Sequence, residues 1–111
     1  MAYDEQLAEE VRERLAAQDG EVIEKRMFGG LGFMVDGNLA VAASRSGGLL
    51  VRTDPADAEE VESQPGVEPM ESRGRRMPGW VFVAPAALAS EAELDAWVTR
   101  ALAFVATLPP K

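Results

Sequence analysis

At 111 residues the chain is long enough for one domain, residues 1–111, that buries about two-thirds of the surface of its unfolded state. It has no cysteine and no histidine, which excludes disulfide scaffolds and thiolate sites and removes the commonest general base and transition-metal ligand. Nineteen acidic against eleven basic residues give a formal net charge of −8, a sign that weakens any case for binding nucleic acid.

The chain also lacks the segments that direct a protein to a membrane. Its first ten residues are acidic and have neither the basic nor the apolar region of a signal peptide. The longest uncharged stretch, Met77 to Ser90, is too short for a transmembrane helix and contains two prolines. We therefore expect a cytoplasmic protein that makes no membrane contact.

The first predicted element is a helix over residues 4–17. Leu7, Val11 and Leu15 recur every four residues and form one apolar stripe. Asp4 precedes this stripe at the position of an N-cap, where its side chain would accept hydrogen bonds from the first free amides of the helix.

From residue 22 to residue 53 apolar residues alternate with a period of two, which is typical of strands. Asp36-Gly37 lies between two such runs and is the strongest short-range signal for a hairpin, because both central residues of its turn need positive φ. We expect an antiparallel meander with strands at residues 31–35, 39–43 and 49–53 and a further candidate at residues 22–27.

The next segment predicts a short helix and two more strands. Asp54-Pro55 places an N-cap and a first-turn proline in their preferred order, which indicates a helix that continues to about residue 63. Beyond it we expect a short edge strand at residues 67–71, a polar loop at residues 72–78 and a largely buried strand at residues 79–84.

The last predicted helix carries the clearest signals. Ser90 and Glu93 have the spacing of a capping box, in which each side chain satisfies a backbone amide of the other residue. A continuous apolar face follows as far as Leu108, and Pro109-Pro110 ends the helix.

Four glycines between positions 29 and 37 raise the question of a phosphate-binding loop. A dinucleotide-binding loop needs a third glycine where Val35 stands and a helix after it, and a P-loop ends in Gly-Lys-Ser/Thr, which is absent. We therefore expect Gly29 and Gly30 to form the bend between two strands. Gly32 would mark a point where another element lies close to the sheet.

Arg73, Arg75 and Arg76 form the only basic cluster in the sequence. They either bind an anion or an acidic segment of a partner, or they are solvated and offset the nearby acidic residues. The second interpretation is the simpler one, because exposed ion pairs contribute little.

Three further groups of residues have a structural and a functional interpretation. The acidic residues of the short helix fit a solvated helix face better than a metal site. Trp80 and Trp97 fit core positions better than stacking on a ligand. Core packing is also the first interpretation of a group rich in methionine, and an adaptable groove or subunit interface is the second; the group is Met27, Phe28, Phe33, Met34 and Met77.

Several stretches together resemble the N-terminal domain of the TfoX/Sxy family, regulators of natural competence in bacteria. They are residues 25–38 (KRMFGGLGFMVDGN), Leu50-Val-Arg52, Met70, Gly74-Arg75, Met77-Pro-Gly-Trp80 and residues 103–111. The resemblance implies an α+β fold with an antiparallel sheet of about five strands, the order α-β(3)-α-β(2)-α and a likeness to secretion chaperones. It gives structural roles to the family-motif residues Met27, Phe28, Gly29, Gly30, Gly37, Gly79 and Trp80, and it supplies no catalytic residue.

The resemblance implies a non-enzymatic regulatory or adaptor domain that acts through protein contacts, as a homo-oligomer, in transcriptional or competence regulation. The alternative is a small-ligand-binding module or an enzyme with a pocket near residues 73–80 and the bend at residues 29–33. Direct DNA binding ranks third because of the net charge. We expect no cofactor and no metal ion.

Overall fold

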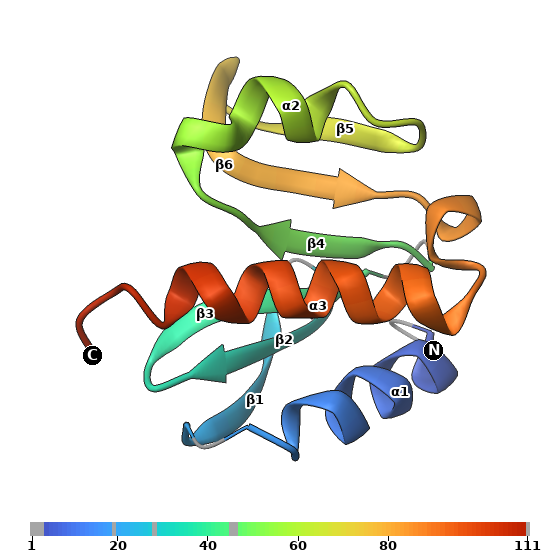
Figure 1. Ribbon diagram of the computed structural model, residues 1–111, viewed down its shortest axis with the longest axis vertical. Coiled ribbons are helices and arrows are strands. Elements are labelled where there is room, and N and C mark those ends of the chain that lie inside the picture. The colour runs from blue at the N-terminus through green and yellow to red at the C-terminus, as the bar shows by residue number, and fades with distance from the viewer. Residues whose placement is uncertain (1–3, 19, 28, 45–46, 111) are drawn as a thin grey trace.

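The computed structural model describes residues 4–18, 20–27, 29–44 and 47–110. They form an antiparallel sheet of six strands in the order β1-β2-β3-β4-β6-β5, with the helices in front of it in Figure 1. The strands are β1 (Val22–Met27), β2 (Gly30–Val35), β3 (Asn38–Ala43), β4 (Leu49–Arg52), β5 (Val67–Ser72) and β6 (Arg75–Val83). The helices are α1 (Glu5–Leu15), α2 (Ala58–Glu62) and α3 (Glu91–Val105), with 3-10 turns at Pro55–Asp57 and Pro85–Leu88. The predicted α+β class is confirmed.

The hydrophobic core lies between the sheet and the helices. The helix α3 crosses β3 and β4 (Figure 1), and its residues Leu94, Trp97, Val98, Ala101 and Val105 are buried. Trp97 is only 7% exposed, so its interpretation as a core residue is confirmed. The strand residues of this core are Leu31, Phe33, Val35, Ala40, Val41, Ala43, Leu49, Val51, Val67, Val81 and Val83.

The two long helices begin where the capping residues in the sequence predicted. The carboxylate of Asp4 accepts from the amides of Gln6 and Leu7 at 3.0 and 3.1 Å, as expected of an N-cap. The capping box of Ser90 and Glu93 is formed in both directions. The helix α3 ends at Val105, one turn before the predicted end at Leu108.

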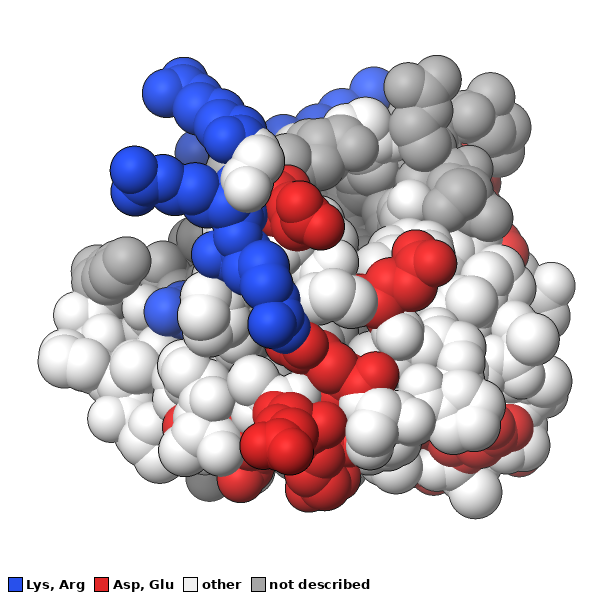
Figure 2. Space-filling model, turned by 90° about the horizontal axis from the view of Figure 1, so that it is seen from above, with Lys and Arg blue, Asp and Glu red and all other residues white. Residues whose placement is uncertain are grey.

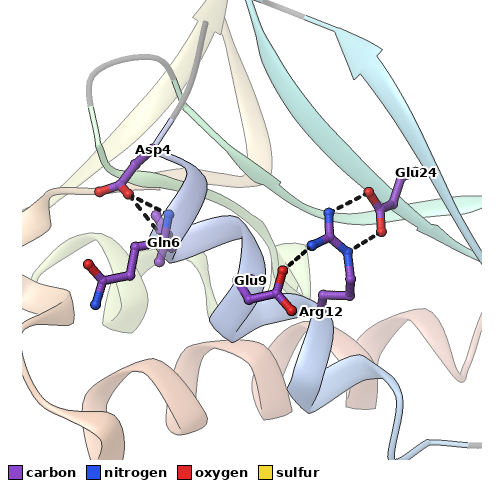
Figure 3. Close-up of polar contacts among 6 residues, drawn as sticks. Asp4, Gln6, Glu9, Arg12 and Glu24 are labelled. Atoms are coloured by element: carbon purple, nitrogen blue, oxygen red, sulfur yellow. Dashed lines mark hydrogen bonds and ion pairs between the residues drawn. The ribbon is translucent and has the colours of Figure 1, made fainter. Parts of the chain in front are cut away.

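An ion pair joins α1 to the edge strand β1 (Figure 3). Arg12 donates from Nε and Nη2 to the two carboxylate oxygens of Glu24, at 2.5 and 2.7 Å, and from Nη1 to Glu9 at 2.6 Å. The hydrogen bonds from Arg12 lower the pKa of Glu24 below its usual range, and the same contact raises the pKa of Arg12.

The predicted hairpin at Asp36-Gly37 is confirmed. These two residues are the whole connection between β2 and β3, and they have φ values of 50° and 85°. Positive φ at both positions defines a type I′ turn, whose twist matches that of the flanking strands. Glycine adopts this conformation without steric cost, and a β-branched residue does not.

The number of strands differs from the expected α-β(3)-α-β(2)-α order. Residues 22–27 form a regular strand, so four strands precede α2 and the sheet has six strands instead of about five. Residues 23–26 of this strand are exposed, and all of them except Ile23 are charged. The strand therefore lacks the alternation of apolar and polar residues that predicts a strand.

The expected polar loop at residues 72–78 is wrong. The strand β5 extends to Ser72 and β6 begins at Arg75, so only Arg73 and Gly74 lie in the turn, with φ values of 54° and 79°. This is the two-residue geometry of the Asp36-Gly37 turn, but arginine is rare at positive φ, and the usual Asn-Gly or Asp-Gly signal is missing.

A large irregularity interrupts the pairing of β5 with β6. Pro69 pairs with Val81 and Glu71 pairs with Arg76, so four residues of β6 lie opposite one residue of β5, Met70. Such a bulge accommodates Pro78, which has no amide hydrogen to donate to the ladder. It also changes the direction of the side chains that follow the turn.

We expect Gly37→Val to reduce the free energy of unfolding by about 1–3 kcal/mol, because valine is strained at positive φ. Urea denaturation of the variant and the parent measures the difference. Asp36→Asn is the matched control, and it should change stability by less than about 0.5 kcal/mol because asparagine tolerates positive φ. Equal midpoints for Gly37→Val and the parent would contradict the turn assignment.

We expect Arg12→Gln to raise the pKa of Glu24 toward its usual range, which NMR titration of the carboxyl group measures. Because the folded-state pKa of Glu24 is depressed, its contribution to stability is present above the unfolded-state pKa and is lost as pH falls through the folded-state value. The variant should therefore be less stable than the parent at pH 7, by at most about 1 kcal/mol for so exposed a pair, and the difference should disappear in acid. Arg75→Gln, at an exposed arginine, is the control and should leave the pKa of Glu24 unchanged.

Candidate functional site

The face of the sheet that the helices leave open carries an apolar groove of about 540 Å³. It runs between the end of β1 and the β5–β6 hairpin. The described residues that line it are Met27, Gly30, Leu39, Ala42, Ala43, Ser44, Leu50, Met70, Glu71, Met77, Trp80 and Phe82. Among them only Ser44 and Glu71 have polar side chains, so the groove presents mainly thioether, aliphatic and aromatic surface.

Two backbone features create the groove. At Gly32 a side chain is missing, and the thioether of Met27 fills that space: a Cβ on Gly32 would lie 2.7 Å from Met27 Sδ and 3.1 Å from Leu39 Cδ1. The bulge in β6 places Met77 and Trp80 along the wall opposite Met27. A residue larger than glycine at position 32 would therefore displace one wall of the groove.

The structure brings together some of the residues singled out by the sequence. Met27, Gly30, Met77 and Trp80 all line the groove, although their sequence positions span more than 50 residues. Trp80 is therefore not the core residue that its apolar surroundings predicted, because it is half-buried in the wall of the groove.

Other family-motif residues lie elsewhere. Gly29 is in the β1–β2 turn with a φ of 72°, and Gly37 is in the β2–β3 turn. Gly79 is buried in the bulge, where its carbonyl accepts from the amide of Thr53 at 2.6 Å. Phe28 falls outside the described residues.

The three arginines of the basic cluster are exposed around the tip of the β5–β6 hairpin. Figure 2, which looks down on this end of the molecule, shows basic side chains projecting from one corner with acidic side chains beside them. Arg76 is paired with Glu62 of α2. Arg75 is exposed next to Arg76, two residues before the groove residue Met77. Lys25 and Arg26 lie on β1, at the other edge of the sheet.

Arg52 adds a charge at the rim of the groove. Its guanidinium carbon lies 4.8 Å from the centroid of the Trp80 ring and 5.6 Å from that of Phe104 in α3. These are cation–π distances, and the contacts hold the indole and the guanidinium together at one end of the groove.

Sequence reasoning missed Leu39, Leu50, Met70 and Phe82 as groove residues. For Leu39, Leu50 and Phe82 the signal was present in their strands, whose runs of apolar residues would cover both faces of the sheet. Met70 lies in β5, where Glu68, Pro69 and Glu71 give no such signal. Which residues of the second face gather into a groove depends on strand order and on the bulge, and no local pattern gives either.

Apolar side chains make up most of the groove lining. Among the residues that the structure describes, no three histidine, cysteine or acidic side chains come together in a way that would hold a metal ion. In the same part of the chain, none of the helices has the length and apolar character needed to cross a bilayer. An apolar groove with the guanidinium of Arg52 at one end is suited to apolar side chains with a negative charge nearby.

Comparison with known proteins identifies the family. The model of the TfoX N-terminal domain matches residues 13–105 of the chain, which includes the sheet, α2 and all of α3. No curated protein and no solved structure matches. The matched segment holds every residue that lines the groove, and the chain belongs to the TfoX N-terminal domain family.

Proposed function

We propose that the protein is a regulatory or adaptor domain, without catalytic activity, that acts by binding a segment of a partner protein in the open-face groove. Its family connects it with competence regulation, and the regulated process would be of that kind, in the cytoplasm. The observation that carries the proposal is the groove itself, which is largely apolar, has a volume of about 540 Å³ and lies on a sheet face that no described helix covers. Contiguous apolar surface of this kind marks binding sites in soluble proteins.

The composition of the lining favours a protein segment over a small molecule. Met27, Met70 and Met77 are unbranched and polarisable, and such side chains adapt to partners of varied shape. Sites for small ligands need a few converging polar groups that fix the orientation of the ligand. Ser44 and Glu71 are the polar side chains among the described lining residues, which is little for that purpose.

The charges at the rim indicate the chemistry of the partner segment. Arg52 lies over Trp80, and Arg75 is exposed two residues before Met77. Carboxylates next to the apolar side chains of the partner would therefore approach fixed positive charges. We propose an apolar segment with flanking acidic residues, for which charge complementarity increases both specificity and the rate of association.

A comparison of three baits tests this function. The parent, Met77→Glu and Met34→Glu are immobilised, and the proteins retained from an extract of the source organism are quantified. Met77 lines the groove, whereas Met34 is partly buried on the same open face outside the lining, so the two variants are matched in chemistry. Circular dichroism checks that both variants fold.

We expect a protein that the parent and Met34→Glu retain equally and that Met77→Glu retains at least about tenfold less, because a carboxylate in an apolar site is left unpaired. Retention that Met77→Glu does not change would contradict the proposal. A metabolite that raises the melting temperature of the parent but not of Met77→Glu would instead support the alternative, a small-ligand module with its pocket beside residues 73–80.

Duplex DNA is expected to bind more weakly than a Kd of about 10⁻⁴ M near physiological salt, because non-specific affinity depends on neutralising phosphates. The exposed cluster of Arg73, Arg75 and Arg76 stands against a formal net charge of −8, and Arg76 is already paired with Glu62. Fluorescence anisotropy with mixed-sequence DNA over a salt series measures the affinity. Micromolar binding that is lost when the three arginines become alanine would contradict this expectation and identify the hairpin tip as a DNA site.

A further inference from the structure

The two edge strands of the sheet differ in how they are protected from pairing with another chain. The strand β5 contains Pro69 and the large irregularity opposite β6, two features that block an incoming strand. The strand β1 contains no proline, and all six of its residues pair with β2 in an unbroken register. An edge of this kind is a template for a further strand.

The backbone of β1 has its free hydrogen-bonding groups at regular positions. The amide of Asp36 donates to the carbonyl of Glu21 at 2.8 Å, which identifies these two residues as a hydrogen-bonded pair. Because such pairs alternate along an antiparallel ladder, Ile23, Lys25 and Met27 bond to β2. The N–H and C=O groups of residues 22, 24 and 26 therefore point outward, where no described strand pairs with them.

The side chains of β1 are exposed and alternate in chemistry. Residues 23–26 are all solvent-exposed. Ile23 is 51% exposed and is the one large hydrophobic side chain classed as exposed in the part of the chain that the structure describes. Glu24, Lys25 and Arg26 follow it, so one short edge offers an apolar side chain and both signs of charge.

We propose that β1 pairs antiparallel with β1 of a second copy of this chain, with Lys25 at the two-fold axis. Residues opposite each other in such a pair have position numbers that sum to 50. Glu24 of each copy then faces Arg26 of the other, and Ile23 faces Met27. Opposite charges and apolar pairs at directly facing positions are the contacts that stabilise antiparallel strands. The proposal specifies the interface of the proposed homo-oligomer and does not depend on what occupies the groove.

The alternative registers are less favourable. Centring the pair on Glu24 would place two carboxylates opposite each other and Ile23 opposite Lys25. Centring it on Ile23 would draw the connection from α1 into the ladder and leave Arg26 opposite Gly20. The proposed register has one like-charged pair, Lys25 with itself, and these long side chains are exposed and can diverge into solvent.

The ion pair in Figure 3 prepares Glu24 for this contact. Arg12 holds both carboxylate oxygens of Glu24, at 2.5 and 2.7 Å, and so limits the rotation of the side chain before association. Less side-chain entropy is then lost when Arg26 of the second copy approaches. Ile23 and Met27 lie on the open face, since Ile23 pairs with Met34 and Met27 lies over Gly32. The pairing therefore places the two grooves on one continuous surface.

Sedimentation velocity of the full chain tests the proposal through charge exchange. The parent should show a concentration-dependent dimer with twice the monomer mass of 11.9 kDa. The Kd of this dimer should lie between about 1 μM and 1 mM, as expected for a small interface. Glu24→Lys and Arg26→Glu should each be monomeric, because facing charges become alike. An equimolar mixture of the two variants should recover the dimer, because both pairs between positions 24 and 26 are again opposite in charge.

Controls separate this surface from the groove and from loss of fold. Arg75→Glu makes the same charge change at the hairpin tip and should dimerise like the parent, as should Met77→Glu, which affects only the groove. Circular dichroism verifies the fold of each variant. A parent that is monomeric throughout, or a mixture that stays monomeric although both variants fold, would overturn the proposal.

Cysteine cross-linking tests the register, since the chain has no cysteine of its own. Lys25 would face its own copy in a non-hydrogen-bonded pair, with Cα atoms about 4.5 Å apart, which is within the range of disulfides. Lys25→Cys should therefore form a covalent dimer under mild oxidation faster than Ile23→Cys or Glu24→Cys. Faster cross-linking at either of those two positions would show a different register and overturn the arrangement proposed here.

Discussion

Burial of a single face of the sheet is the constraint on which the structure depends. The helices pack against one side, and α3, with Trp97, Val98 and Ala101 buried, closes the core over β3 and β4. No described helix packs on the other face, yet Leu39, Leu50 and Phe82 on that face are as apolar as many core residues. A sheet built in this way folds around one core and retains a second apolar surface.

The second surface is shaped by irregularities and not by further secondary structure. The missing side chain at Gly32 lets the thioether of Met27 lie flat on the sheet, and the bulge turns Met77 and Trp80 toward it. Each irregularity weakens the ladder where it occurs. Both are compatible with a stable domain because the opposite face at these positions is packed against helices, which concentrates the stabilising contacts in one layer.

Features determined within a few residues could be predicted from the sequence, and features determined across strands could not. The Asp36-Gly37 turn, the cap at Asp4 and the capping box at Ser90 are all specified by neighbours in the chain. The β5–β6 turn was missed because Arg73 adopts positive φ without the usual turn sequence. The groove was anticipated only in two alternative interpretations, an adaptable groove at the methionines and a pocket near residues 73–80. Its walls come from β1, β3, β4, β5 and β6 and meet through strand order.

The bulge in β6 also divides that strand into two parts with different local stability. Residues 81–83 pair with both β4 and β5 and have buried valines at positions 81 and 83, whereas residues 75 and 76 pair only with β5 and are exposed. Amide hydrogens of the inner part can exchange with solvent only when the core opens, whereas those at the tip are released by local fraying of the hairpin. The tip that carries Arg73, Arg75 and Arg76 is thus the less protected part of the hairpin, where opening leaves the core ladder intact.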